Sequence, residues 1–283
     1  MPASTEETAY LPGLLPGNRF IYALISLRAG GLSIGINLNP GRECNFDCLY
    51  CNVSRVDGGK KVGLDIKTMS RELMDALSLA GSGELQKMPP FQNAPPELMR
   101  LRNVALSGEG EPTLCEKFDE VVQEISRIRA IPRFPEFKLV LITNASGLDL
   151  KPVRQGLKFF ATTDEIWAKL DAGTQDYMSH VNRTDVTLQS ILSNIQRIGC
   201  ERPIVIQGLF SCIHGRGPSD AEIAAYIGRL SDLKKAGARI SLVQVHSVVR
   251  KPARPGCAHL SLAHLSEIAR RVRETTGLKA NVF

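Results

Sequence analysis

The chain has 283 residues, of which 43% are hydrophobic and 23% charged, and its formal net charge is +6. This length fits one large domain or two small ones, and the composition excludes a fibrous, disordered or membrane-embedded chain. No apolar run reaches the roughly 18 residues of a membrane helix, and the first residues lack the basic-then-apolar pattern of a signal peptide. We therefore expect a cytoplasmic protein without membrane association, in which clustered thiols bind metal or do chemistry.

In chain order, residues 1–32 form an N-terminal extension to which the sequence assigns no structure. Six short runs with apolar residues at consecutive positions come next, as expected of strands covered on both faces. They span residues 33–38, 102–107, 137–143, 164–170, 203–210 and 238–246. Residues 82–101, which are polar and rich in proline, interrupt this series and are interpreted as an insertion.

Amphipathic helices are predicted between the later strands, because apolar residues recur there with a period of 3.6. Their stripes are Phe118, Val121, Val122, Ile125 and Ile128; Leu188, Ile191, Leu192, Ile195 and Ile198; and Ile223, Ile227, Leu230 and Leu233. Thr184 or Asp185 is the expected cap of the second helix and Ser219 or Asp220 of the third. A last helix is expected over 261–274, before a short apolar end at 278–283.

This alternation of strands and helices predicts a parallel sheet with right-handed crossovers, either an incomplete barrel or an open α/β sheet. In both architectures the chemistry belongs at the carboxyl ends of the strands. Polar motifs should therefore follow the predicted strands directly.

Three cysteines follow the first predicted strand, in the order C-x3-C-x2-C. Cys44, Cys48 and Cys51 could hold three irons of a [4Fe–4S] cluster and leave the fourth iron open to a small molecule. A structural zinc site would need a fourth ligand, and the nearest histidine in sequence is His180. A zinc-stabilised, non-catalytic nucleic-acid-binding protein stays the alternative from another class.

These motifs resemble those of the radical S-adenosylmethionine (SAM) superfamily. The cysteine pattern with Tyr50 before its last cysteine resembles the superfamily signature, "SGEGEPTL" (107–114) resembles its Gly-Gly-Glu-Pro motif, and "TNASG" (143–147) is similar to its Thr/Ser-Asn-Gly. The resemblance covers about residues 33–250, the expected core, and leaves 251–283 as a basic C-terminal extension.

The resemblance implies an α/β fold, a partial (β/α)6 TIM-like barrel, with a [4Fe–4S] cluster and SAM as cofactors. It also implies cofactor-binding roles: the amino end of SAM on Gly108, Gly110, Glu111 and Pro112, its ribose or carboxylate near Thr143 and Asn144, and its adenine near Tyr50.

With "WAKLDAGT" (167–174) included, the set most closely resembles single-cluster bacterial relatives of wyosine (tRNA) synthetases. That likeness implies that Lys169 and Asp171 face the site; a local ion pair between them is the alternative. Wyosine synthetases carry further cysteines for a second cluster. The other four cysteines here (Cys115, Cys200, Cys212 and Cys257) show no ligand spacing, so we predict no second cluster.

Further candidates follow the last two predicted strands. Cys212 could donate a hydrogen atom and His214 could move protons, although a packed thiol beside an exposed loop histidine is the alternative. Gln207 is expected to point inward. His246, Arg250, Lys251 and Arg254 follow the sixth predicted strand, and residues 234–283 as a whole hold ten Lys or Arg against Glu267 and Glu274. They suit a phosphate or an RNA backbone, or are simply a solvated surface.

The expected function is reductive cleavage of SAM and abstraction of a hydrogen atom from a substrate, with flavodoxin or ferredoxin as electron donor. The expected substrate is anionic, either RNA, as in a tRNA nucleoside, or a phosphorylated small molecule. A small metabolite, sugar or peptide is the alternative within the same reaction class.

Overall fold

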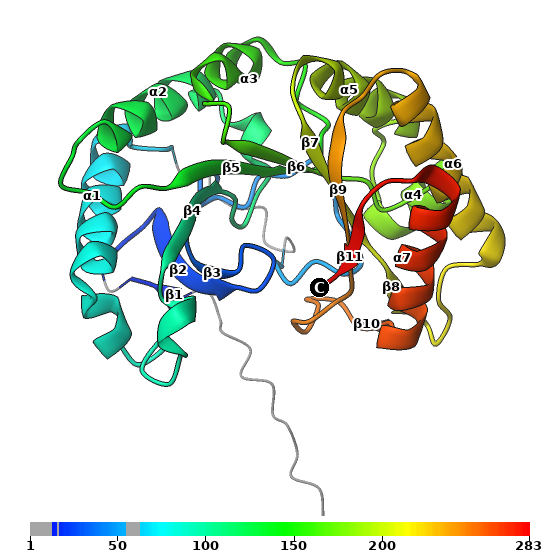
Figure 1. The fold of residues 1–283 in the computed structure, drawn as a ribbon, viewed down its shortest axis with the longest axis horizontal. Helices are drawn as coiled ribbons and strands as arrows, with labels where there is room; N and C mark the ends of the chain where they lie inside the picture. Colours follow the sequence, from blue (N-terminus) through cyan, green and yellow to red (C-terminus); the bar gives the residue numbers. More distant parts are fainter. Residues whose placement is uncertain (1–12, 16, 55–62) are drawn as a thin grey trace, which may run out of the picture.

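Nine strands form one continuous sheet that curls into an open barrel (Figure 1). The computed structural model describes residues 13–15, 17–54 and 63–283. In spatial order the strands are β1 (Gly13–Leu14), β2 (Ile21–Ser26), β3 (Gly31–Ile36), β4 (Leu101–Leu106), β5 (Lys138–Thr143), β6 (Glu165–Lys169), β7 (Ile204–Leu209), β9 (Ile240–His246) and β11 (Ala280–Val282).

The six strands predicted from apolar runs are confirmed as β3 to β7 and β9, each with ends within two residues of the expectation. All five pairings among them are parallel. Because parallel strands all end at the same edge of a sheet, the loops that follow β3, β4, β5 and β6 lie together at one mouth of the barrel.

The N-terminal extension contributes two strands that its sequence did not reveal. β2 pairs with β3, and β1 with β2, in antiparallel ladders. The β2–β3 turn closes on Gly30 and Gly31, whose φ angles of +73° and +154° suit glycine. The last strand, β11, lies parallel to β9 at the other end of the sheet. A separate two-stranded antiparallel sheet pairs β8 (Ser211–Ile213) with β10 (Cys257–His259).

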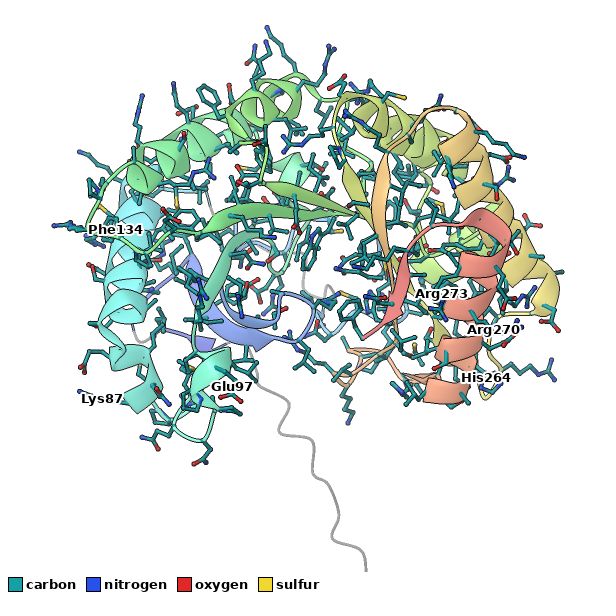
Figure 2. The ribbon with its side chains drawn as sticks, viewed as in Figure 1. Lys87, Glu97, Phe134, His264, Arg270 and Arg273 are labelled. Atoms are coloured by element: carbon teal, nitrogen blue, oxygen red, sulfur yellow. The ribbon has the colours of Figure 1, made fainter. Side chains whose placement is uncertain are left out.

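Helices line the outer face of the curved sheet (Figure 1). They are α1 (Ile66–Ser82), α2 (Phe118–Arg129), α3 (Lys151–Gly156), α4 (Gln175–Asn182), α5 (Leu188–Glu201), α6 (Asp220–Lys235) and α7 (Leu262–Thr276). The predicted stripes of α2, α5 and α6 are buried, apart from the half-buried Ile223. The opposite faces are polar: Figure 2 shows Arg270 of α7 on the outside, where it pairs with Glu267 and Glu274.

The predicted cap of α6 is confirmed, since the Ser219 hydroxyl accepts from the Glu222 N–H. The predicted cap of α5 is wrong. Thr187 caps that helix, and the Thr184 hydroxyl instead donates to the Asn45 carbonyl at 2.9 Å. This tertiary hydrogen bond holds Thr184 in the connection before α5. The predicted insertion continues from the end of α1 into two short 3-10 helices, Glu84–Lys87 and Pro96–Leu98.

Within the described residues, no helix combines the length and apolarity needed to cross a membrane.

Candidate functional site

The cysteine loop that follows β3 is attached to the end of α4. The Asp47 N–H donates to the Asn182 carbonyl at 3.0 Å, and the Leu49 N–H donates to the Val181 carbonyl at 2.9 Å. Both bonds lie inside the span Cys44–Cys51, so they fix the backbone between the first and last of the three thiols. Each of the three cysteines is half-buried.

The loop after β4 packs directly on the chain that leads into Cys44. The Glu111 N–H donates to the Glu43 carbonyl at 2.8 Å, and the Asn39 side-chain amide donates to the Glu111 carbonyl. A Cβ at Gly110 would collide with the Glu43 carbonyl and with Asn39. Gly110 therefore permits the close contact between these two loops, a packing role that the sequence did not indicate.

The Glu111 carboxylate ties the loop after β4 to the loop after β5. It accepts hydrogen bonds from the Thr113 N–H at 3.1 Å, the Thr113 hydroxyl at 2.7 Å, the Thr143 hydroxyl at 2.5 Å and the Asn144 N–H at 2.8 Å. Burial raises the pKa of Glu111, and the hydrogen bond from the Asn144 N–H partly offsets this rise. With four internal donors, this carboxylate positions the loops around it. Its neighbour Pro112 is buried and begins a short 3-10 turn.

The loop after β5 lies beside the first cysteine. The Asn144 side-chain amide is 4.0 Å from the Cys44 sulfur and donates to the Asn45 side-chain oxygen at 2.9 Å. Asn144 is 5% exposed and Thr143 is 1% exposed. The three motifs singled out in the sequence therefore lie together at one mouth of the barrel.

A buried network joins Tyr50 to the end of β6. The Tyr50 hydroxyl donates to the Asp171 carboxylate and accepts from the Lys169 ammonium at 3.2 Å. That ammonium also lies 4.7 Å from the centre of the Tyr50 ring, a cation–π contact. The described residues show no direct ion pair between Lys169 and Asp171, because the phenol stands between them. The simple ion pair considered from sequence is therefore replaced by a three-residue arrangement.

Sequence reasoning missed Asn182, the last residue of α4. Its side-chain amide lies 3.0 Å from the Asp171 carboxylate, 3.1 Å from the Tyr50 hydroxyl and 3.4 Å from the Cys48 sulfur. It is 2% exposed. An asparagine at a helix end looks like an ordinary cap, so nothing local marks it as a neighbour of a cysteine 134 positions away.

Burial shifts the pKa values of the groups in this network. Burial, followed by the nearby Asp171, raises the pKa of Tyr50 well above its ordinary value, so its hydroxyl stays protonated. Burial also raises the pKa of the Cys48 thiol, and the Lys169 charge partly offsets that rise. A metal that binds Cys48 must therefore displace a proton.

Gln207 lies inside the barrel, as predicted, on β7 next to Lys169 in the ladder. It is 0% exposed, and its amide donates to the Gln244 side-chain oxygen at 2.7 Å. Its own side-chain oxygen has no hydrogen-bond partner. A buried, unpartnered acceptor of this kind is suited to a bound molecule or water.

Cys212 lies on β8 of the small β8–β10 sheet and His214 follows that strand, so neither belongs to the Tyr50 network. His214 is exposed, and its backbone N–H donates to the Gly256 carbonyl at 2.8 Å. In this small sheet it is Ile213 and its partner Cys257 that pack toward Tyr50, together with Cys48. Cys212 points to the opposite face because strand residues alternate. Its proposed role, like that of His214, stays a prediction.

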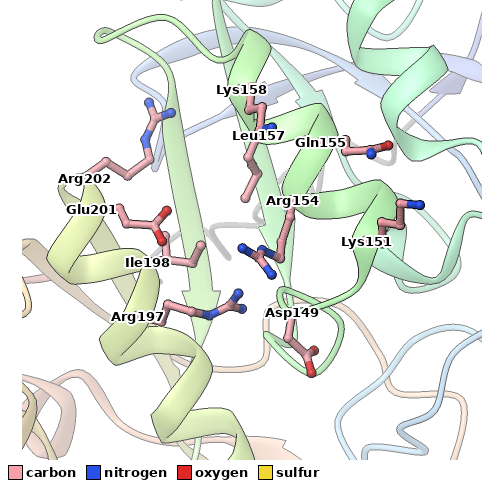
Figure 3. Close-up of a pocket in the computed structure, with 10 residues that line it drawn as sticks. All are labelled: Asp149, Lys151, Arg154, Gln155, Leu157, Lys158, Arg197, Ile198, Glu201 and Arg202. Carbon is pink, nitrogen blue, oxygen red and sulfur yellow. The ribbon is translucent and has the colours of Figure 1, made fainter.

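A cavity lies on the outer face between α3 and α5, away from the three motifs (Figure 3). Its volume is about 520 Å³, and none of the predicted site residues lines it. Five cations surround it: Lys151, Arg154, Lys158, Arg197 and Arg202. A smaller cavity of about 210 Å³ opens at the amino end of the strands, and Arg28, Asn103 and Gln244 are among its lining residues.

The donor chemistry of the three thiols fits an iron–sulfur cluster, because thiolates are its usual protein ligands. Within the described residues, no three His, Cys, Asp or Glu side chains gather as one ion would require. In a [4Fe–4S] cluster each thiolate binds a different iron, so three thiolates spread along one half-buried loop are a fitting donor set.

No family model matches this sequence. Among curated proteins, a UPF0026 protein of Synechocystis is 28% identical over 62% of this chain and 58% of its own length. A Brachyspira hyodysenteriae protein named GTPase Obg is 26% identical over 57% of this chain and 20% of its own length. The chain thus matches less than two thirds of either relative.

Solved structures of radical SAM enzymes share this fold. A structure of TYW1 with a bound lysine–pyruvate adduct superposes with a TM-score of 0.56 at 17% identity, over 89% of this chain and 75% of that one. SuiB of Streptococcus suis bound to SAM superposes with a TM-score of 0.60 at 13% identity, over 91% of this chain and 52% of SuiB. The predicted α/β fold, a partial TIM-like barrel of the radical SAM type, is confirmed.

Proposed function

We propose that this protein is a radical SAM enzyme whose [4Fe–4S] cluster is held by Cys44, Cys48 and Cys51. One observation carries the proposal: the half-buried thiols follow the first parallel strand, and the Gly108–Pro112 and Thr143–Asn144 loops are hydrogen-bonded to the same segment. The class of the structurally similar enzymes supports it, and SuiB is described bound to SAM.

The cluster, when bound, would deliver one electron to SAM and yield methionine and a 5′-deoxyadenosyl radical that abstracts a hydrogen atom from the substrate. The protein's own part is positional. The backbone of Gly108–Pro112 would bind the amino end of SAM, and Glu111 would keep that loop beside Thr143 and Asn144. Gln207 offers an unpartnered oxygen from inside the barrel.

Tyr50, Lys169 and Asp171 would form the wall of the pocket next to Cys48. Their mutual hydrogen bonds hold the side chains in single positions before any ligand arrives, which reduces the ordering cost of binding. We also propose Cys212 as hydrogen donor and His214 as proton carrier, acting from the separate β8–β10 sheet and the turn that follows β8.

For the substrate we propose an anionic molecule, with a tRNA nucleoside as the first candidate and a small metabolite, sugar or peptide as the second. The basic segment 234–283 is only partly available to an RNA substrate, because six of its ten cations already have protein partners. These six are Lys234, Arg239, Arg254, Arg270, Arg271 and Arg273. RNA binding that weakens steeply with salt would support the first candidate, and its absence the second.

The proposed reaction needs an electron donor, and flavodoxin or ferredoxin in the cytoplasm is our proposal for it. Chemical reduction replaces this donor in a first test.

The direct test is anaerobic reconstitution with iron and sulfide, reduction with dithionite, addition of SAM and detection of 5′-deoxyadenosine by mass spectrometry. Cys48→Ala should lose both the bound iron and the product. Cys200→Ala is the matched control, because Cys200 is exposed at the end of α5 and far from the loop in sequence.

Two results would contradict the proposal. One is a wild-type protein purified anaerobically with zinc and no iron, which would favour the nucleic-acid-binding alternative. The other is a Cys48→Ala variant that keeps its cluster and still cleaves SAM.

A further inference from the structure

The β2–β3 turn places an arginine inside the barrel and a leucine outside it. Leu27 is 74% exposed, whereas its neighbour Arg28 is half-buried. The turn is held by the Gly30 N–H, which donates to the Ser26 carbonyl at 2.9 Å, and by Arg102, which donates to the Gly30 carbonyl at 3.0 Å. Solvation alone would favour the reverse arrangement, so the inward position of Arg28 calls for a reason.

Arg28 reaches across the open side of the barrel. Its guanidinium lies 3.5 Å from Nε2 of His246, which ends β9 and is 218 positions away. β2 and β3 lie near one end of the curved sheet and β9 near the other (Figure 1). This contact therefore joins the two ends of the incomplete barrel, and His246 at 8% exposure is buried there.

Gly35 on β3 makes room for the ring of Tyr22. A Cβ at Gly35 would collide with the Tyr22 ring, so the ring lies where a side chain of β3 would otherwise point. The Tyr22 hydroxyl pairs with the Ser107 hydroxyl at 2.6 Å. Tyr22 is close enough to Arg250, Arg28 and Glu109 for the charges of all three to act on it.

Two arginines lie close together here, and among the described residues neither has a carboxylate within ion-pair distance. Burial, followed by repulsion from Arg250, lowers the pKa of Arg28 to about 10, so Arg28 is still cationic at neutral pH. Burial, followed by Arg28 and Lys169, lowers the pKa of His246 well below its ordinary value, so this imidazole is neutral. In the part of the chain that is described, no carboxylate forms an ion pair with Arg28 or Arg250.

The contrast with Arg254 is instructive, since it follows Arg250 by only four positions. Arg254 lies 2.8 Å from the Asp47 carboxylate, and Arg183 shares the same carboxylate at 3.3 Å. Among the described residues, the fold thus neutralises Arg254 and Arg183 and leaves Arg28 and Arg250 without a carboxylate partner. A half-buried charge without a partner is less favourable than a paired one, and an anionic ligand would supply the missing partner.

We propose that Arg28, His246 and Arg250 form an anion subsite that binds a carboxylate or phosphate group of the substrate inside the barrel. Arg28 presents planar donors suited to either group. His246, released from Arg28, can hydrogen-bond the same group. The inference rests on the proposed function, because it takes the barrel interior to be the substrate pocket.

The test titrates inorganic phosphate, and in a separate arm acetate, into the reconstituted protein without SAM, by calorimetry at constant ionic strength. Wild type should bind one of the two anions. Arg28→Met should weaken that binding by roughly tenfold to a hundredfold, the loss expected for one charge-assisted hydrogen bond. Arg28→Lys, which keeps the charge, should lose less. Preference for phosphate indicates a phosphorylated substrate, and preference for acetate a carboxylic acid.

Arg71→Met is the matched control, because Arg71 is exposed on α1 and loses the same charge by the same substitution. It should change the affinity by less than about twofold. The proposal is overturned if wild type binds neither anion at millimolar concentration, or if Arg28→Met binds as wild type does.

SAM cleavage by wild type is measured in parallel, so that the two proposals fail separately. Arg28-dependent anion binding in a protein that never cleaves SAM would keep the subsite and reject the radical SAM function. SAM cleavage together with anion binding that is independent of Arg28 would keep the function and reject the subsite.

Discussion

Two walls of the barrel satisfy their polar groups in opposite ways. The thiol wall consists of Cys44–Cys51 with Glu111, Asn144, Tyr50, Asp171 and Asn182, and its polar side chains are hydrogen-bonded to one another. The cationic wall consists of Arg28, His246 and Arg250, and its charges have no counter-ion among the described residues. Lys169 touches Tyr50 and repels Arg28.

The difference indicates what each wall is for. A satisfied network fixes geometry before binding and gains little from a new partner. A half-buried charge without a partner gains from one of opposite sign. On the proposed function, the thiol wall would hold a cofactor in one position, and the cationic wall would receive a charged group. Four substitutions test this contrast.

The largest effect is expected from Glu111→Ala in the thiol wall. It removes the acceptor of two buried backbone N–H groups, those of Thr113 and Asn144. At about 1–3 kcal/mol for each unsatisfied group, the free energy of unfolding should fall by about 3 kcal/mol or more. Urea denaturation measures it. Glu116→Ala, at an exposed position nearby, should stay within about 0.5 kcal/mol of wild type.

Gly110→Ala should cause the second-largest loss of stability, because the added Cβ meets the Glu43 carbonyl and pushes the loop after β4 away from the cysteine loop. Overpacking of this kind costs about 1–3 kcal/mol. Iron retention after reconstitution should fall with it. Gly228→Ala is the control: nothing lies within 4 Å of its added Cβ in α6, so it should stabilise by about 0.5–1 kcal/mol. Full iron retention in Gly110→Ala would contradict the packing role.

A pH-dependent effect is expected from His246 in the cationic wall. Its pKa in the folded protein lies below the ordinary value of 6.5, because burial and then the charges of Arg28 and Lys169 disfavour the imidazolium. The unfolded chain then binds more protons below pH 6.5, so stability is lost as the pH falls below that value, by at most about 1.4 kcal/mol per pH unit.

His246→Gln should remove this slope, measured by urea denaturation between about pH 7.5 and about pH 5.5. His180→Gln, at an exposed position on α4, should keep the slope of wild type. Equal slopes in wild type and His246→Gln would show that this imidazole is not held neutral in the folded protein.

The smallest change in stability is expected from Arg28→Met without ligand, and this change can be a gain. Methionine keeps much of the buried volume and removes an unpaired charge, so stability should stay within about 1 kcal/mol of wild type or rise. Thermal and urea denaturation both measure it. A loss of about 3 kcal/mol would mean that Arg28 has a stabilising partner in the free protein, and the contrast between the walls would fail.

Local patterns in the sequence determined the positions of the elements. Consecutive apolar runs placed β3 to β7 and β9 within two residues, and the apolar stripes placed α2, α5 and α6. The three cysteines and the two strand-end motifs lie together at one mouth of the barrel, because parallel strands end at a common edge. Both results depend on short-range periodicity, which a single sequence displays directly.

Only the tertiary structure decided which distant residues complete the two walls. Asn182 meets Cys48, Arg28 meets His246, and Cys257 rather than Cys212 packs toward Tyr50. For the same reason Thr184 does not cap α5, and its hydroxyl donates to the Asn45 carbonyl instead. These contacts arise from sheet closure and loop packing across 100 or more positions of the sequence, and no local propensity encodes such partners.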